Sequence, residues 1–263
     1  MCRASRWLSR PCRSFPPKNS KTRALSTLFI SDLHLTEERP EANERFIELL
    51  EGKGRAADAL YILGDFFEYW IGDDDLGEPF NAVIAGLLKD LTQRGVRVYL
   101  MHGNRDFLIG EGFCAATGAE LLGDPTVVQI GGTDTLLMHG DTLCTDDVEY
   151  QAWRRKARDP AFQADFLAKP LGERRKAVAQ MRERSRQVVQ EKTAEIMDVS
   201  DDAVRQALRT HGVRRLIHGH THRPGRHVVD VDGERCERWV LPDWYGRGGY
   251  IQLDRGNPRL VQF

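Results

Sequence analysis

Hydrophobic residues gather in short runs that are separated by polar segments along the chain. Five runs are rich in aliphatic, β-branched and aromatic residues and carry almost no charge: 28–30, 59–63, 96–101, 136–138 and 215–217. Runs this short and this apolar are typical of strands that are buried on both faces of a sheet. The pattern therefore predicts an α/β fold around a buried sheet.

A polar signature follows directly after each of these five runs. The signatures are Asp32-Leu33-His34, Gly64-Asp65, Gly103-Asn104-Arg105-Asp106, His139-Gly140-Asp141 and Gly219-His220-Thr221-His222. Glycine occurs in the loop after four of the five runs, where the backbone must turn tightly or approach another group closely. Because α/β sheets place their active sites at strand ends, we expect the five signatures to meet at one place.

Taken together, the signatures predict a site for two divalent metal ions. Two neighbouring cations need a carboxylate that can bridge them, with imidazole and carbonyl ligands that converge from several strand ends. Each signature alone is weak, because one buried histidine is usually a hydrogen-bonded core residue. Five ordered signatures at five predicted strand ends are unlikely to arise by chance, so the sequence favours a two-metal phosphoesterase.

The ordered series resembles that of the calcineurin-like metallophosphoesterases, and the resemblance covers residues 27–222. It implies an α/β fold in which a β-sandwich is flanked by helices. It also implies that one metal is held by Asp32, His34, Asp65 and His222, and the other by Asp65, Asn104, His139 and His220. Asp65 is then the bridging ligand. The resemblance implies two Mn²⁺ ions, although such ligands also suit Zn²⁺, Fe²⁺ or Co²⁺.

Longer blocks around the signatures are similar to one branch of this family that acts in lipid A biosynthesis. The blocks span residues 31–35, 64–74, 102–108, 139–147, 195–199 and 218–224. The similarity implies hydrolysis of the pyrophosphate bond of UDP-2,3-diacylglucosamine to UMP and 2,3-diacylglucosamine 1-phosphate. We expect Arg105 and Asn104 to be catalytic, with Arg105 bound to the phosphate by a charge-assisted hydrogen bond. Asp106 is expected to orient an imidazole, that of His139.

Residues 148–200 depart from a bare core of this kind, and we expect them to form a helical cap between core segments 27–147 and 201–263. The stretch 153–192 contains twelve lysines and arginines and five acidic residues. Ser185, Val189 and Lys192 share the less polar stripe of the predicted helix, where a lysine is costly to bury unless an anion meets it. The resemblance implies substrate contacts by Asn104, Arg105, Asp147, Ser185, Lys192 and His220. Val189 replaces the asparagine of the family and is assigned only a place near the ligand.

The predicted cap is also rich in large apolar residues: Trp153, Phe162, Phe166, Leu167, Leu171 and Met181. They can pack on themselves or surround acyl chains, and both interpretations stay open. Basic residues beside apolar ones suit a protein that lies on an anionic membrane surface. We therefore expect a cytoplasmic protein that associates peripherally with the inner membrane. No apolar run approaches the ~20 residues of a transmembrane helix.

Composition narrows the picture in other respects. The net charge of -1 over 263 residues gives no general attraction to nucleic acid, and no protein partner is inferred. The five cysteines (Cys2, Cys12, Cys114, Cys144 and Cys236) are odd in number and form no Cys-x-x-Cys pair, which argues against disulfides and a zinc site. Cys144 follows the His139 block but is interpreted as structural, since a two-metal site already supplies hydroxide.

The two ends of the chain support further predictions. Residues 1–26 contain seven basic residues and no acidic one, and we expect them to be disordered. They lack the apolar stretch of a secretory signal, so a start codon assigned too far upstream is favoured over a targeting peptide.

Asp232-Gly233 between two β-like runs predicts a hairpin that contributes to a second sheet. The histidines that match no ligand position (His102, His211, His218 and His227) are interpreted as structural, whereas Trp244 and Tyr245 either brace the site or fill the core.

Two other functions fit part of the pattern. Another phosphohydrolase of this fold, acting on a nucleotide, a phosphoprotein or nucleic acid, would keep the metal signatures without the cap pattern of Ser185 and Lys192. A noncatalytic scaffold that uses the fold for protein contacts would have lost ligands, and all seven are present.

Overall fold

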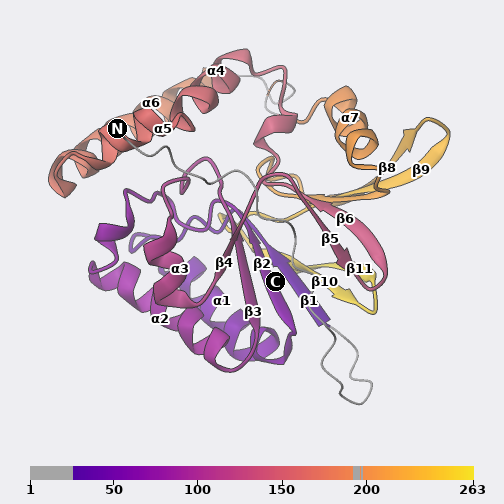
Figure 1. Cartoon of the computed structure of the whole chain (residues 1–263), viewed down its shortest axis with the longest axis horizontal. Coiled ribbons are helices and arrows are strands. Elements are labelled where there is room, and N and C mark those ends of the chain that lie inside the picture. Colours follow the sequence, from indigo (N-terminus) through magenta and orange to yellow (C-terminus); the bar gives the residue numbers. More distant parts are fainter. Residues whose placement is uncertain (1–25, 192–195, 197) are drawn as a thin grey trace, which may run out of the picture.

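The computed structural model describes residues 26–191, 196 and 198–263, and two sheets packed face to face form its centre (Figure 1). The first sheet has the strand order β11 (Asn257–Gln262), β10 (Gly249–Asp254), β1 (Ser26–Ile30), β2 (Ala59–Leu63), β3 (Arg97–Met101) and β4 (Glu120–Leu122). The second has the order β5 (Thr126–Ile130), β6 (Thr133–Leu137), β7 (Arg215–His218), β9 (Glu234–Val240) and β8 (Gly225–Val231). The predicted α/β sandwich is confirmed.

Helices cover the outer faces of both sheets (Figure 1). The first sheet is covered by α1 (Pro40–Leu49), which continues into a π-helical turn at Leu50–Gly54, and by α2 (Pro79–Gln93) and α3 (Glu111–Thr117). The second sheet is covered by α7 (Asp201–His211). Short 3₁₀ turns lie at Asp73–Asp75 and Asp141–Leu143. Of the described helices, none combines the length and the apolar character that crossing a bilayer requires.

Alternation of side chains along the central strands explains why these runs are apolar throughout. In β2, Leu60 and Ile62 pack toward the helices, whereas Tyr61 and Leu63 pack against the second sheet. Every residue of β2 is buried, so the strand has no polar face that would reveal a period of two. The parallel pairing of β1, β2 and β3 brings their carboxyl ends to one edge of the sheet.

The carboxyl-terminal part follows the hairpin prediction closely. β8 and β9 pair antiparallel in the second sheet, and Asp232 and Gly233 both have positive φ, at 55° and 82°. Two such residues form the turn that matches the twist of a two-residue hairpin. A further apolar run near the end of the sequence, 250–253, belongs to β10, which joins the first sheet and pairs antiparallel with β1. Ser26 already belongs to β1, and residues 1–25 lie outside the description.

Three helices, α4 (Val148–Ala157), α5 (Pro160–Leu167) and α6 (Leu171–Glu191), lie between β6 and β7 in the sequence and are called the helical insertion below. Asp147 and Asp159 cap α4 and α5 by accepting backbone N–H groups, and Pro160 opens α5. Arg174 of α6 is buried and pairs with Asp74, which fixes the first turn of α6 to the core. The division of the chain into a core and a cap at these limits stays a prediction.

Candidate functional site

Side chains from five loops meet at the carboxyl ends of β1, β2, β3, β6 and β7. Ligand atoms of Asp32, His34 and His222 all lie within 4.8 Å of one another, and the same holds for Asp32, Asp65 and His139. Asp32 belongs to both groups. The five signatures therefore converge on one place, although they are spread over almost two hundred residues.

The remaining predicted ligands lie against this cluster. The Oδ1 atom of Asn104 is 3.0 Å from Nε2 of His139 and 3.0 Å from Nδ1 of His220. The carboxylate of Asp65 is 3.7 Å from Nε2 of His34 and 3.9 Å from Nε2 of His139, so it contacts one histidine from each of the two groups. Its predicted bridging role is compatible with these distances and stays a prediction.

Two buried atoms at the site lack hydrogen-bond partners, which indicates whether a cation suits these residues. Asp32 Oδ1 and His34 Nε2 are buried and have no hydrogen-bond partner among the described residues. A buried carboxylate oxygen without a partner is costly, and a divalent cation is a partner that both atoms accept. Carboxylate, amide oxygen and imidazole nitrogen together suit first-row divalent metals. The residues therefore fit the metal centre predicted from the sequence.

The two histidines beside Asn104 differ in pKa because their charged surroundings differ. Burial disfavours the imidazolium form of His220, and with the nearby His139 it lowers the pKa of His220 to about 4. Burial also acts on His139, but Asp65, Asp141 and Asp32 outweigh it and raise the pKa of His139 to about 9. His220 is thus a neutral ligand at pH 7, whereas a cation that binds His139 displaces a proton.

Backbone strain is concentrated in the ligand residues. Five of them have positive φ: Asp32 (55°), His34 (50°), Asp65 (51°), His220 (67°) and His222 (55°). Among the other non-glycine residues that the structure describes, only Asp232 and Arg255 share this conformation. Such a conformation costs on the order of 1 kcal/mol or more per residue and persists only where the surroundings impose it. The loops therefore hold the ligands in place at the expense of local stability.

Two glycines allow the loops to approach the carboxylates. A Cβ atom at Gly103 would lie 2.1 Å from Oδ1 of Asp65, and one at Gly219 would lie 2.3 Å from Oδ2 of Asp32. No side chain fits at either place. Glycine at these two strand ends therefore lets the backbone lie close to the carboxylates of the predicted ligands.

The predicted role of Asp106 is wrong. His139 Nδ1 lies 2.9 Å from the carbonyl oxygen of Leu63, so a backbone group orients the imidazole and leaves Nε2 for the metal. Asp106 instead accepts the backbone N–H of Gly103 at 2.8 Å and that of Phe66 at 2.7 Å. Asp106 thus ties the loop after β3 to the loop after β2.

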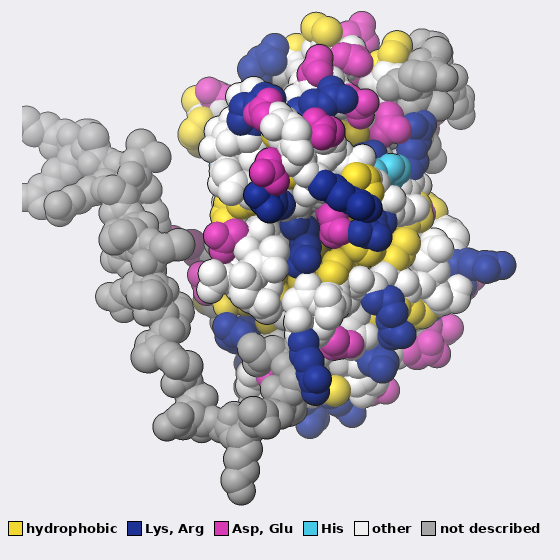
Figure 2. All heavy atoms as spheres, turned by 90° about the vertical axis from the view of Figure 1, so that its right-hand side faces the viewer, with side chains coloured by type: hydrophobic (Ala, Val, Ile, Leu, Met, Phe, Trp, Pro, Cys, Tyr) yellow, Lys and Arg dark blue, Asp and Glu magenta, His cyan; other side chains and the backbone are white. Residues whose placement is uncertain are grey.

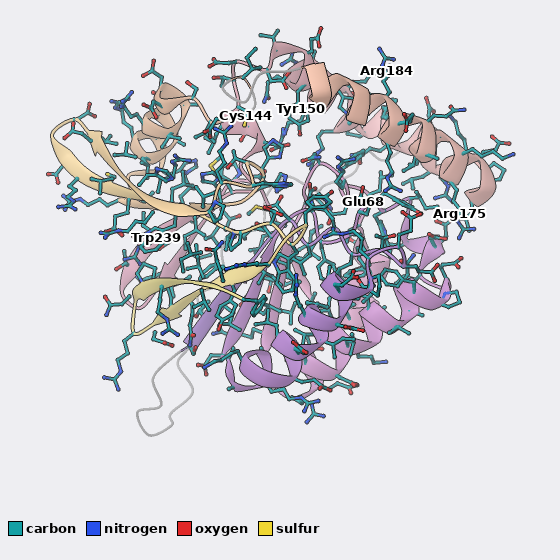
Figure 3. All side chains as sticks on the ribbon, turned by 180° about the vertical axis from the view of Figure 1, so that it is seen from behind. Glu68, Cys144, Tyr150, Arg175, Arg184 and Trp239 are labelled. Atoms are coloured by element: carbon teal, nitrogen blue, oxygen red, sulfur yellow. The ribbon has the colours of Figure 1, made fainter. Side chains whose placement is uncertain are left out.

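A cavity of about 580 Å³ lies beside the metal ligands, between the core and the helical insertion. Figure 3 shows Glu68 on the side of the core and Tyr150 on the side of the insertion, and both line the cavity. Asn104 and Arg105 form part of its polar wall. The apolar wall consists of Trp70, Phe107, Leu108, Trp153, Phe162, Phe166, Val178 and Met181. Of the insertion residues in this wall, Phe166 and Val178 also pack against the core, and the ring of Trp153 lies against that of Phe162. Packing is therefore observed, and contact with acyl chains stays a prediction.

The predicted substrate contacts are placed unevenly. Asn104, Arg105 and Asp147 line the cavity, and His220 lies beside Asn104. Ser185 and Val189 lie on α6, in a stretch whose side chains are outside the description, and Lys192 lies outside the described residues. The cap contacts of these three residues stay predictions.

Two uncertain residues now have a role in packing or bracing. Trp244 is buried and fills the core. Tyr245 is half exposed, and its ring lies 4.8 Å from that of His34 and 5.6 Å from that of His222, so it braces two ligands.

Burial, together with nearby carboxylates, raises the pKa of the Cys144 thiol to about 12, which agrees with a structural cysteine.

Glu68 and Arg182 were not predicted as site residues. Glu68 is buried, contacts His34 and Tyr245, and pairs with Arg182 of α6. Burial opposes ionisation of Glu68, but His34, Arg105 and Arg182 lower its pKa to about 2. A signal was available, because Glu68 is a lone charge in the aromatic run 66–70.

Comparison with known proteins adds sequence evidence to this geometry. Residues 25–224 match the family model described as calcineurin-like phosphoesterase. A Pseudomonas entomophila protein named UDP-2,3-diacylglucosamine hydrolase is 50% identical over 236 residues, which cover 90% of this chain and 98% of that protein. A protein of the same name from Aromatoleum aromaticum is 48% identical over 237 residues, covering 90% and 96%. A solved archaeal phosphodiesterase aligns over 91% of this chain and 100% of its own, with 12% identity and a TM-score of 0.47.

Proposed function

This chain belongs to the calcineurin-like phosphoesterase family, and we propose that it hydrolyses the pyrophosphate bond of UDP-2,3-diacylglucosamine to give UMP and 2,3-diacylglucosamine 1-phosphate. The observation that carries the proposal is the cavity whose wall includes the predicted ligand Asn104 and Arg105 together with many apolar side chains. A ligand with a phosphate at one end and acyl chains at the other suits both walls. The similar proteins named for this hydrolysis support the same substrate.

Two divalent metals fit the site, and we propose Mn²⁺ for both. Asp32, His34, Asp65 and His222 would hold one ion, and Asp65, Asn104, His139 and His220 the other. When bound, such a pair supplies a hydroxide near neutral pH and stabilises negative charge on the phosphoryl group. The chain supplies the rest of the catalysis, which consists of binding, orientation and exclusion of water.

Arg105 binds the phosphate in this proposal. Its guanidinium lines the cavity next to Asn104, while its backbone N–H donates to Oδ1 of Asp65 at 2.8 Å. Its Nε has no hydrogen-bond partner among the described residues and can meet a phosphoryl oxygen, while the backbone is held by the predicted bridging ligand. Charge-assisted hydrogen bonds of this kind stabilise the charge that grows on the oxygens during transfer.

The helical insertion encloses the lipid part of the substrate. Aromatic and aliphatic side chains of α4, α5 and α6 face Phe107 and Leu108 of the core across the cavity. Acyl chains in this chamber lose contact with water, which favours binding by roughly 25 cal/mol per Å² of apolar surface buried. We propose that Asp147, Ser185 and Lys192 contact the polar part of the substrate and that Val189 lies near it.

Product analysis tests the proposed function. Metal-loaded enzyme is expected to release UMP and the lipid 1-phosphate in equal amounts from UDP-2,3-diacylglucosamine, as measured by chromatography and mass spectrometry. Bis-p-nitrophenyl phosphate serves as a generic diester. Hydrolysis of this diester without release of UMP would leave a phosphoesterase with another substrate.

Arg105→Ala is expected to lower kcat about a hundredfold without emptying the metal site, because the variant loses the guanidinium but keeps the backbone bond to Asp65. Steady-state kinetics on the lipid substrate gives kcat, and elemental analysis of the same preparation gives the metal content. Arg105→Lys keeps the charge and should recover part of the rate. Loss of metal in Arg105→Ala would contradict a role confined to the phosphate.

The helical insertion also has a surface that suits a membrane. Val148 is 70% exposed, and Leu167 is exposed to a lesser degree, as are Trp153 and Met181 of the cavity wall. They belong to a part of the chain that is rich in lysine and arginine. Apolar side chains beside basic ones favour an anionic lipid surface. We propose that this face lies on the cytoplasmic side of the inner membrane, where an acylated substrate would be reached.

Val148→Glu is expected to lower co-sedimentation with anionic vesicles at low salt, because it places a negative charge on the surface that would meet the lipid. Val83→Glu is the matched control, since Val83 is 59% exposed on α2, which is not part of the helical insertion. Wild-type protein that stays in the supernatant with these vesicles would contradict the proposed association.

A further inference from the structure

Glu68 lies between the metal ligands of the core and α6 of the helical insertion. Its Oε2 atom is 3.4 Å from Nδ1 of His34 and 3.1 Å from the hydroxyl of Tyr245. Its Oε1 atom is 3.0 Å from a guanidinium nitrogen of Arg182. The Glu68 side chain is only 9% exposed, so its two oxygens meet two different parts of the molecule within a shielded environment.

The two nitrogens of His34 have different surroundings. Nε2 faces Asp65 at 3.7 Å, on the side of the other predicted ligands, which is the position of a metal-binding nitrogen. Neither nitrogen forms a hydrogen bond within the described part of the chain. Nδ1 faces Glu68. A histidine ligand commonly directs its second nitrogen toward a carboxylate, which fixes the tautomer and strengthens binding to the metal. Glu68 is placed to do this for His34.

Arg182 differs from the other arginines that join α6 to the core. Arg174 pairs with Asp74, and Arg175 pairs with Asp75 and Glu78, all near the start of α6. None of these three carboxylates contacts a predicted metal ligand in the described contacts. Figure 3 shows Arg175 toward the outer end of the helix, whereas Glu68 lies nearer the centre of the molecule. Among the ion pairs described between α6 and the core, that of Arg182 is thus the one that reaches a carboxylate in contact with a predicted ligand.

We propose that Glu68 is a positioning residue that couples the helical insertion to the metal centre, with one oxygen orienting His34 and the other held by Arg182. A displacement of α6 would remove Arg182 and leave the Glu68 carboxylate free to turn away from His34. The metal centre would then be complete only when α6 lies against the core. The inference rests on the metal site of the proposed function and does not depend on the identity of the substrate.

Metal binding provides the test, because it is measured without any substrate. Glu68→Gln keeps the shape of the side chain and loses its charge, and it is expected to weaken binding of one of the two Mn²⁺ ions about 10-fold to 100-fold. Titration of the metal-free full chain against a chromophoric chelator gives both affinities. The melting temperature of the same metal-free protein reports on folding, and a merely structural role would change that temperature and not one affinity alone.

Arg182→Ala separates coupling from local chemistry. It is expected to weaken the same metal ion about threefold or more, and the double variant with Glu68→Gln should be no weaker than Glu68→Gln alone, because the two residues act through one contact. Arg175→Ala is the matched control, since it removes another ion pair between α6 and the core and should keep both affinities. Arg182→Lys should recover part of the loss.

Wild-type affinities in Glu68→Gln, or equal behaviour of Arg182→Ala and Arg175→Ala, would overturn the inference. If Glu68→Gln does not fold, Arg182→Ala and its control still decide. Hydrolysis of bis-p-nitrophenyl phosphate by the same variants shows whether the weakened ion is needed for turnover. Should the affinities change as expected while UDP-2,3-diacylglucosamine is not cleaved, the proposed substrate fails and the role of Glu68 stands.

Discussion

Asp65→Asn is expected to lower turnover about a thousandfold or more while the protein stays folded. The carboxylate of Asp65 lies 3.7 Å from Nε2 of His34 and 3.9 Å from Nε2 of His139, so it contacts a predicted ligand of each ion. The amide keeps the size and one oxygen of the side chain, but it lacks the charge that two neighbouring cations need between them. Loss of a group on which the whole site depends removes most of the rate enhancement. Steady-state kinetics with saturating Mn²⁺ measures the effect.

Stability gives this prediction its control. Burial raises the pKa of Asp65, so the metal-free protein holds an unfavourable carboxylate at this place. A neutral amide costs less to bury, and the melting temperature of metal-free Asp65→Asn should therefore equal or exceed that of the wild type. Near-wild-type turnover in a preparation that contains two metals would refute the bridging role. A fall in melting temperature would point to a structural role instead.

Removal of the metals is expected to lower turnover about as much as Asp65→Asn does, and this loss should be reversible. Protein stripped with a chelator and dialysed should lose at least about three orders of magnitude in rate, because the hydroxide and the charge stabilisation both depend on the cations. Addition of Mn²⁺ should restore turnover. Elemental analysis before and after each step relates rate to metal content, and full activity in the stripped protein would exclude the two-metal site.

Reloading of the stripped protein is expected to depend on pH with a definite sign. His139 in the metal-free site has a pKa of about 9, so a cation must displace its proton at neutral pH. The apparent affinity for Mn²⁺ should thus rise with pH up to about 9 and fall as the solution becomes acidic. His220, whose pKa is about 4, adds no such dependence near neutrality.

The fold could be predicted where strands are buried on both faces. β1, β2, β3, β6 and β7 appear in the sequence as apolar runs because neither side of these strands, apart from their ends, meets water. β4, β5 and β11 were not predicted. Val127 of β5 and Leu121 of β4 are exposed, and β11 begins with Asn257-Pro258, so these edge strands resemble loops. β5 and β11 pair antiparallel with the strands next to them in the chain, β6 and β10, and the hydrophobic pattern alone does not reveal this pairing.

The place where the predicted metal ligands meet could be inferred from the sequence signatures, but the groups that hold these residues could not. His139 is oriented by the carbonyl oxygen of Leu63, and a backbone group leaves no trace in a pattern of side chains. The left-handed conformation of Asp32, His34 and Asp65 is likewise invisible, since these residues adopt it only where the surroundings impose it. Glu68 meets Arg182 across more than a hundred residues, and only the folded chain shows that pair.

Figure 2 shows basic side chains around a hydrophobic area on one face of the molecule. The face drawn there is the right-hand side of Figure 1, where α7, β8 and β9 lie. The proposed membrane surface is formed instead by α4, α5 and α6. Basic side chains alone are therefore a poor guide to the membrane-facing side, and the variants at Val148 and Val83 are needed to locate it.

The helical insertion leaves and re-enters the core at a single junction. The backbone N–H of Ser200 donates to the carbonyl oxygen of Leu143 at 2.9 Å, so the chain before α4 and the chain before α7 meet. A segment whose ends already touch can be lengthened, shortened or exchanged during evolution at little entropic cost to the remainder. The catalytic core and the insertion can then change separately in evolution, provided that a new insertion still places a basic side chain against Glu68, as Arg182 does here.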